Sequence, residues 1–114
     1  KMAKVAILES LKDEIIKKFK EESKIIFRQM YSLGKNPHKG KLLGNVGGIV
    51  IKEIKYKSFR FYFITDGFKL KIIDESNLTN LLIRFVRMSN KKDQQETINE
   101  IKKILIKFGP NKFN

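Results

Sequence analysis

The residues that could do chemistry in this chain are cations, and Arg60 has the clearest setting among them. The segment FRFYFIT (59–65) alternates like a β-strand, in which successive side chains point to opposite faces. Its three phenylalanines would form one apolar row facing a core, while Arg60 and Tyr62 share the other face. A mid-strand arginine opposite such a row seldom adds stability. We therefore interpret Arg60 as a functional residue on the solvent-facing side of a sheet.

The cations around Arg60 are concentrated in one segment, which indicates an anionic partner. Positions 35–60 contain seven Lys and Arg residues against Glu53 alone, and the whole chain has 25 against 12 acidic residues, for a net charge of +13. Such a charge attracts RNA, DNA, an anionic membrane or an acidic protein. A lysine-rich proteome or a thermophile surface is the alternative explanation. Tyr56 and Tyr62 could stack on bases, although strand packing is the interpretation we favour for both.

Several other chemistries are excluded by the residue types that the chain lacks. It has no cysteine, and His38 is its single histidine. Thiolate metal sites, thiol catalysis and Ser–His catalysis therefore do not apply, and we expect neither a metal nor a cofactor. No apolar run approaches the roughly 18 residues of a membrane span, and no signal-peptide core precedes the first charges. We expect a cytoplasmic protein without a membrane partner, with Met2 as its natural start.

The first elements of the chain are predicted to be a short strand and a helical hairpin. Residues 4–8 (KVAIL) predict a strand, and apolar residues then recur at helical spacing over 11–33, with a hinge near 21–23. Gly34 and Pro37 end this helical hairpin. The glycine-rich segment that follows is predicted to be a loop.

From residue 49 onward, apolar and polar residues alternate as they do in β-strands. Four segments show it: 49–57, 58–65, 68–73 and 81–88. Asp66-Gly67 between the second and third segments predicts a hairpin turn, and residues 74–77 form a polar break. A last helix is expected to start near Asn90–Asp93 and to end at Gly109-Pro110.

These elements predict an α+β fold in one domain over residues 2–110. An N-terminal strand and a helical hairpin pack on an antiparallel sheet of 4–5 strands, and a C-terminal helix follows. We expect the helical hairpin to cover the phenylalanine row. We also expect the apolar stripe of the C-terminal helix to pack in the core rather than to bind a partner.

Three motifs in this order resemble a known family. NPHKGKLLG (36–44) resembles the N-P-x-x-G-K-x-L-x-G segment of RelE/ParE-superfamily toxins, the toxins of type II toxin–antitoxin systems. YKSFRFYF (56–63) is similar to the GDYRVIY strand of that family, and VRMSNKKD (86–93) to its VRVGHRKD strand end. The predicted order of elements also matches over nearly the whole chain.

The resemblance implies a toxin that an antitoxin wraps and neutralises. RelE-like members cut mRNA in the ribosomal A site without a metal and inhibit translation, whereas ParE-like members poison DNA gyrase. We therefore expect a metal-free endoribonuclease acting on mRNA at the ribosome, with an acidic, adjacently encoded antitoxin as partner. The alternative is a non-catalytic member, either a gyrase-directed toxin or a basic nucleic-acid- or ribosome-binding module.

Metal-free RNA cleavage needs a base for the 2′-hydroxyl, cations around the transition state and an acid for the leaving oxygen. Clustered Lys and Arg can supply all three, because neighbouring positive charges lower the pKa of a lysine. The resemblance assigns transition-state stabilisation to Arg60 and the leaving group to Lys91, and Arg87 matches a third family arginine. Lys52 completes the expected catalytic set if it shares the face of Arg60. The cations expected to bind RNA are Lys39, Lys41, Lys55, Lys57 and Lys92.

The chain also departs from the family pattern, and these departures favour the non-catalytic alternative. The common family histidine is Asn90, and a downstream aromatic that stacks on the base is Gln95. The strand register matters as well, because pairing of Phe59 with Ile54 would place Glu53 on the face of Arg60 and neutralise it. A shift by one residue would place Lys52 there instead. Arg84 and Arg87 could each simply edge the sheet.

Overall fold

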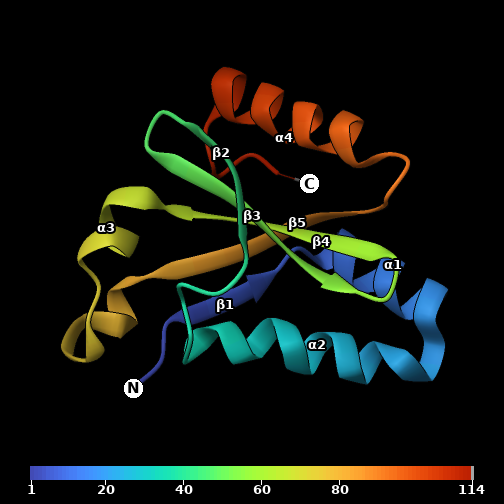
Figure 1. Cartoon of the computed structure of the whole chain (residues 1–114), viewed down its shortest axis with the longest axis horizontal. Coiled ribbons are helices and arrows are strands. Elements are labelled where there is room, and N and C mark those ends of the chain that lie inside the picture. The colour runs from blue at the N-terminus through green and yellow to red at the C-terminus, as the bar shows by residue number, and fades with distance from the viewer. Residues whose placement is uncertain (114) are drawn as a thin grey trace.

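A mixed β-sheet with helices on both faces forms the centre of the computed structural model, which describes residues 1–113 (Figure 1). The sheet has five strands in the order β1-β5-β4-β3-β2. They are β1 (Lys4–Ile7), β2 (Lys41–Val46), β3 (Ile49–Tyr56), β4 (Phe59–Asp66) and β5 (Leu82–Asn90). β1 runs parallel to β5 and the other neighbours are antiparallel, so the predicted α+β layout is confirmed.

Four α-helices and three 3₁₀ turns surround this sheet. The helices are α1 (Glu9–Phe19), α2 (Ser23–Tyr31), α3 (Gly67–Ile72) and α4 (Gln94–Phe108). The 3₁₀ turns are Lys20–Glu22, Ser32–Gly34 and Glu75–Asn80, and the first of them is the hinge expected near residues 21–23. No helix within residues 1–113 is both long and apolar enough to cross a membrane.

The helical hairpin α1–α2 covers the phenylalanine row, as predicted. Phe61 and Phe63 of β4 are fully buried against the two helices together with Phe85 of β5. Phe59 is half-buried at the edge, where its ring meets that of Phe19 edge-on at a centroid distance of 5.2 Å. Burial of one such aromatic side chain contributes roughly 3 kcal/mol, so this row is the main anchor of the hairpin.

Helix α4 covers the opposite face of the sheet, and this corrects the expected exposure of Arg60. Figure 1 shows α4 across the sheet from α1 and α2. Its residues Ile98, Ile101 and Leu105 pack on Tyr62 and other apolar residues of β3, β4 and β5. The apolar stripe is thus core, as predicted, except at Phe108, which is 57% exposed. Arg60, on the same face as Tyr62, is only 7% exposed and does not face solvent.

Two local predictions in the middle of the chain are wrong. Residues 41–46, expected in a loop, form the edge strand β2, because Gly47 and Gly48 adopt positive φ values of 56° and 87° and close a tight turn to β3. Residues 68–73, expected as a strand, belong mainly to helix α3. The Asp66 carboxylate accepts the Lys69 N–H at 3.0 Å, so Asp-Gly begins a helix here instead of a hairpin turn.

The register between β3 and β4 decides which residues accompany Arg60. Strand β3 reverses at Lys57–Ser58, and Tyr56 lies opposite Phe59. In this register Glu53 lies opposite Tyr62, on the Arg60 face. Lys52 lies opposite Phe63, on the other face, so the alternative that placed it beside Arg60 is wrong.

Candidate nucleic-acid interface

Two cross-strand rows on the α4 side of the sheet contain the charged residues, because directly opposed residues share a face. The first row runs across three strands and consists of Lys55, Arg60 and Ser89. The second row runs across four strands and consists of Lys41, Glu53, Tyr62 and Arg87. Gln94, the first residue of α4, donates its side-chain N–H to Glu53 at 3.1 Å. The start of α4 therefore lies over these two rows.

The middle of the two rows is a buried polar cluster of Glu53, Arg60, Tyr62 and Ser89. Tyr62 is fully buried, and its hydroxyl lies 2.6 Å from Ser89 Oγ. Since Ser89 Oγ donates its hydrogen to the Asn90 carbonyl at 2.9 Å, Tyr62 is the donor to Ser89. Burial raises the pKa of Tyr62 above its ordinary value, and the Glu53 carboxylate adds to the rise. Tyr62 is therefore a protonated donor at neutral pH.

Two charged groups in this cluster are incompletely satisfied. Arg60 Nη1 donates to the Ser58 carbonyl at 3.1 Å, but Arg60 Nε is buried without a hydrogen-bond partner. Glu53, 1% exposed, likewise has a buried Oε2 without a partner. Each such group costs about 1–3 kcal/mol. Glu53 shares the face of Arg60 but forms no ion pair with it among the described residues. A cluster that costs stability in this way is a candidate functional site.

Three of the expected RNA-binding lysines lie around one groove beside the cluster. The groove has a volume of about 500 Å³ at the β2–β3 edge and is lined by Lys39, Lys41 and Lys55. Gln29 of α2, Gly40, Ile54 and the buried acidic residue Glu53 complete its lining. All three lysines are exposed. We call this groove, with its three lysines, the basic groove. Lys55 also belongs to the first row, where it lies directly opposite Arg60, so one lysine of the groove is the cross-strand neighbour of Arg60.

Lys91, expected in the catalytic set, and Lys92, expected to bind RNA, follow the end of β5. Lys91 and Lys92 are exposed in the connection between β5 and α4, shortly after Ser89 in the first row. The Asn90 side-chain oxygen accepts the Asp93 N–H at 2.8 Å and shapes this connection. Lys91 and Lys92 thus lie beyond β5, on one side of Arg60, and the basic groove lies at β3, on the other side of Arg60.

Lys52 does not join the expected catalytic set. Its Nζ donates to the His38 carbonyl at 2.9 Å and lies 6.0 Å from the centre of the Phe63 ring. Burial lowers the pKa of Lys52. Its contact holds the loop that carries Lys39, and Gly40 in that loop has a φ of 105° and lies directly against Phe63. Lys52 therefore positions the basic groove from the opposite face of the sheet.

Arg87 and Lys57 form contacts within the protein. Arg87 Nε donates to Glu100 Oε1 at 3.1 Å, and the guanidinium lies 5.4 Å from the centre of the Phe113 ring, so Arg87 ties α4 and the C-terminal segment to the sheet. Lys57 forms an ion pair with Glu22 at 2.7 Å, and the Tyr56 hydroxyl donates to the same carboxylate at 2.6 Å. Tyr56 is half-buried and Tyr62 is fully buried, in agreement with the favoured interpretation that both tyrosines pack in the sheet.

Two polar residues at the cluster, Gln94 and Ser89, were not predicted from the sequence. The contact of Gln94 with Glu53 could not be predicted, because several polar residues occur near the start of this helix. Ser89 stands at the glycine position of the VRVGHRKD motif, and that replacement by itself does not predict a buried hydroxyl group. Within residues 1–113, no group of three or more His, Asp or Glu side chains could hold a metal ion.

Comparisons with protein-family models, with curated proteins and with solved structures found no match for this chain. The resemblance to RelE/ParE toxins accordingly rests on the three sequence motifs. The geometry of the basic groove and of the polar cluster stands independently of that resemblance.

Proposed function

We propose that the chain binds RNA through the basic groove and the adjoining first row. The observation that carries this proposal is the convergence of Lys39, Lys41 and Lys55 on one groove next to the buried Arg60. Lysine ammonium groups bind phosphates as point charges and supply affinity without reading sequence. Because the groove displays no aromatic ring, contact is mainly with the RNA backbone. The choice of RNA over DNA comes from the resemblance to translation-directed toxins.

A second candidate function is mRNA cleavage at the ribosome. It is favoured by the direct cross-strand pairing of Arg60 with Ser89, since these residues belong to two different family-like motifs. With Arg60 only 7% exposed, cleavage requires the first turn of α4, which begins at Gln94, to move away from the first row. Arg60 would then stabilise the transition state, and Lys91 would serve the leaving oxygen. The unpaired Glu53 carboxylate opposes this chemistry, so we place binding first.

An acidic antitoxin is the protein partner that this charge distribution favours. A chain carrying +13 and an exposed basic groove would attract an acidic protein rapidly and in a salt-sensitive way. Co-expression with an adjacent acidic open reading frame should relieve any toxicity. A complex whose contacts avoid both the groove and α4 would contradict this partner assignment.

The experiment that separates the candidates combines RNA binding with primer extension on ribosome-bound mRNA. Binding that Lys39→Gln and Lys55→Gln weaken, without new cleavage sites, identifies a binding module. Defined cleavage sites that disappear in Lys91→Gln identify a ribonuclease, and Lys91 is suited to this test because it is exposed. Supercoiling by DNA gyrase is assayed in parallel, and inhibition there without RNA binding would overturn both candidates.

A further inference from the structure

A surface hollow adjoins the basic groove and is formed by a single loop between the 3₁₀ turn Ser32–Gly34 and β2. Its volume is about 520 Å³, within the range of roughly 300–1,000 Å³ typical of small-molecule sites. Its lining consists of Lys35, Asn36, Pro37, His38 and Lys39. The hollow therefore has no acidic residue in its lining, whereas the groove includes Glu53. Because Lys39 lines both, an RNA strand in the groove would reach the hollow.

The loop that forms the hollow is held in place by contacts of its backbone. Pro37 is buried, and Lys52 Nζ donates to the His38 carbonyl at 2.9 Å. The Lys39 N–H donates to the Asn36 carbonyl at 3.1 Å and closes a turn. The side chains of Asn36 and His38 are exposed and form no hydrogen bond with any residue in the described part of the chain. A loop that is already ordered and has unused polar side chains can bind a ligand at a small entropic cost.

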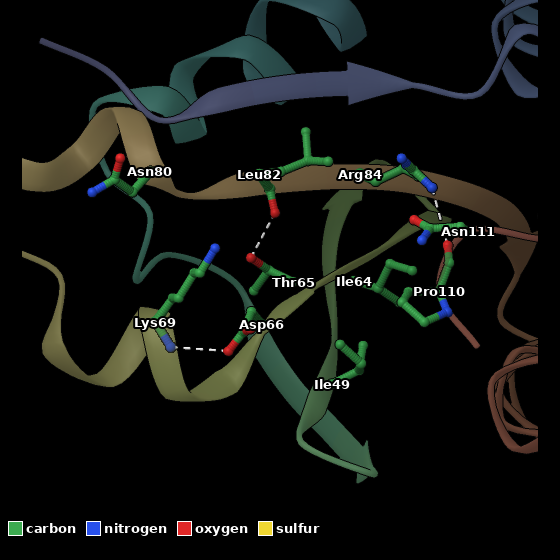
Figure 2. Close-up of a pocket in the computed structure, with 10 residues that line it drawn as sticks. All are labelled: Ile49, Ile64, Thr65, Asp66, Lys69, Asn80, Leu82, Arg84, Pro110 and Asn111. Carbon is green, nitrogen blue, oxygen red and sulfur yellow. Dashed lines mark hydrogen bonds between the residues drawn. The ribbon is translucent and has the colours of Figure 1, made fainter.

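Another cavity, between α3 and the C-terminal segment, uses its polar groups within the protein (Figure 2). Thr65 Oγ1 donates to the Leu82 carbonyl at 2.7 Å, and Arg84 Nη1 donates to the Pro110 carbonyl at 3.0 Å. Asp66 also lines that cavity and would repel a phosphate group. The hollow beside the basic groove has neither feature, so it is the better site for part of an RNA.

We propose that the hollow binds one unpaired base of a single-stranded RNA whose phosphates lie along the basic groove. This inference rests on the proposed RNA binding and adds the class of RNA. The His38 imidazole is the aromatic ring of the lining, and proteins stack unpaired bases on aromatic side chains, histidine included. The Asn36 side-chain amide both donates and accepts hydrogen bonds, as the edge of a base requires. Lys35 and Lys39 supply positive charge for the adjoining phosphates.

Fluorescence anisotropy with two RNAs tests the base site: a short single-stranded RNA of mixed sequence and an abasic RNA of the same length. We expect the RNA with bases to bind about tenfold more tightly, because only this RNA can stack a base in the hollow. Equal affinities would overturn the base site and leave the proposed RNA binding intact. Absence of binding by both RNAs would overturn the proposed RNA binding and the base site with it.

Variants of the single histidine assign the preference to the hollow. His38→Ala should abolish the tenfold preference, and His38→Phe, which keeps a flat ring, should retain it. Both changes leave the backbone carbonyl that Lys52 binds, so both variants should fold. Tyr31→Ala removes another exposed aromatic ring, outside the hollow and the groove, and should keep the preference. Lys55→Gln should weaken both RNAs by the same factor, because that contact is with phosphate. An unchanged preference in His38→Ala, or its loss in Tyr31→Ala, would refute the assignment.

Proton NMR of the one imidazole ring reports stacking directly, since no other histidine contributes signals. The His38 Hε1 and Hδ2 resonances should move upfield on addition of the RNA with bases, because a stacked base adds its ring current. With the abasic RNA they should move much less. Equal shifts with the two RNAs would show that the imidazole responds to phosphate alone and would overturn the proposal.

Discussion

Glu53 and Arg60 should be energetically coupled, although they do not form an ion pair. They lie in adjacent rows on neighbouring strands, where diagonal side chains are roughly 5–8 Å apart. At an effective dielectric constant of about 20, opposite charges at that separation attract by about 2–3 kcal/mol. Solvent screening is small, because Glu53 is 1% and Arg60 7% exposed. The replacements Glu53→Gln and Arg60→Met remove the charges with little change of volume.

A double-mutant cycle measured by urea denaturation tests this coupling. We expect the two single changes and the double change to give an interaction free energy of about 2–3 kcal/mol. The matched control cycle pairs Glu53→Gln with Lys55→Met, which lies on the same face but is exposed, and should give less than about 1 kcal/mol. A Glu53–Arg60 coupling below about 0.5 kcal/mol would refute the conclusion that the buried cluster is one electrostatic unit.

Three further predictions concern stability. Phe61→Ala should cost about 3–5 kcal/mol in chemical denaturation, because the ring is fully buried, and a cost below about 1 kcal/mol would contradict the core assignment. Gly40→Ala should cost about 2–4 kcal/mol, since a Cβ there would lie 2.8 Å from Phe63 Cζ at a φ of 105°, whereas Gly48→Ala, strained but uncrowded, should cost only about 1 kcal/mol. Hydrogen bonds from Lys57 and Tyr56 lower the pKa of Glu22 below 4.5. The free energy of unfolding of the unaltered chain should therefore exceed that of the Glu22→Gln variant by its full amount above that pH, and the difference should shrink as the pH falls further. A difference that does not change with pH would rule out that contact.

Periodicity was sufficient for the parts of the fold that depend on burial. The phenylalanine alternation predicted that the face of β4 carrying Phe61 and Phe63 is core, and the helical spacing of Ile98, Ile101 and Leu105 predicted that α4 is packed. Turn chemistry was less decisive, because Asp-Gly suits both a hairpin turn and a helix start. At Asp66 the carboxylate caps α3, so the helical outcome prevails.

The candidate site could be predicted only in part. Its lysines were recognisable as an excess of positive charge. That they lie around one groove depends on how the strands pair, which cannot be read from a local sequence pattern. The exposure of Arg60 depends on where α4 docks, and an apolar stripe indicates that a helix packs without indicating the face it covers. The position of Lys52 depends on the turn at Lys57–Ser58, since changing the register by one residue would exchange it with Glu53.

The most direct test of the proposed function is the salt dependence of RNA binding by fluorescence anisotropy with a short labelled single-stranded RNA. Contact with about five phosphates predicts a slope of log K against log salt near −3.5. The triple change Lys39→Gln, Lys41→Gln, Lys55→Gln should reduce the magnitude of that slope by about 2 and weaken binding. The control Lys17→Gln, Lys24→Gln, Lys103→Gln removes equal charge at exposed helical positions and should preserve the slope. Equal losses in the two triple variants, or a flat salt dependence, would contradict RNA binding through the basic groove.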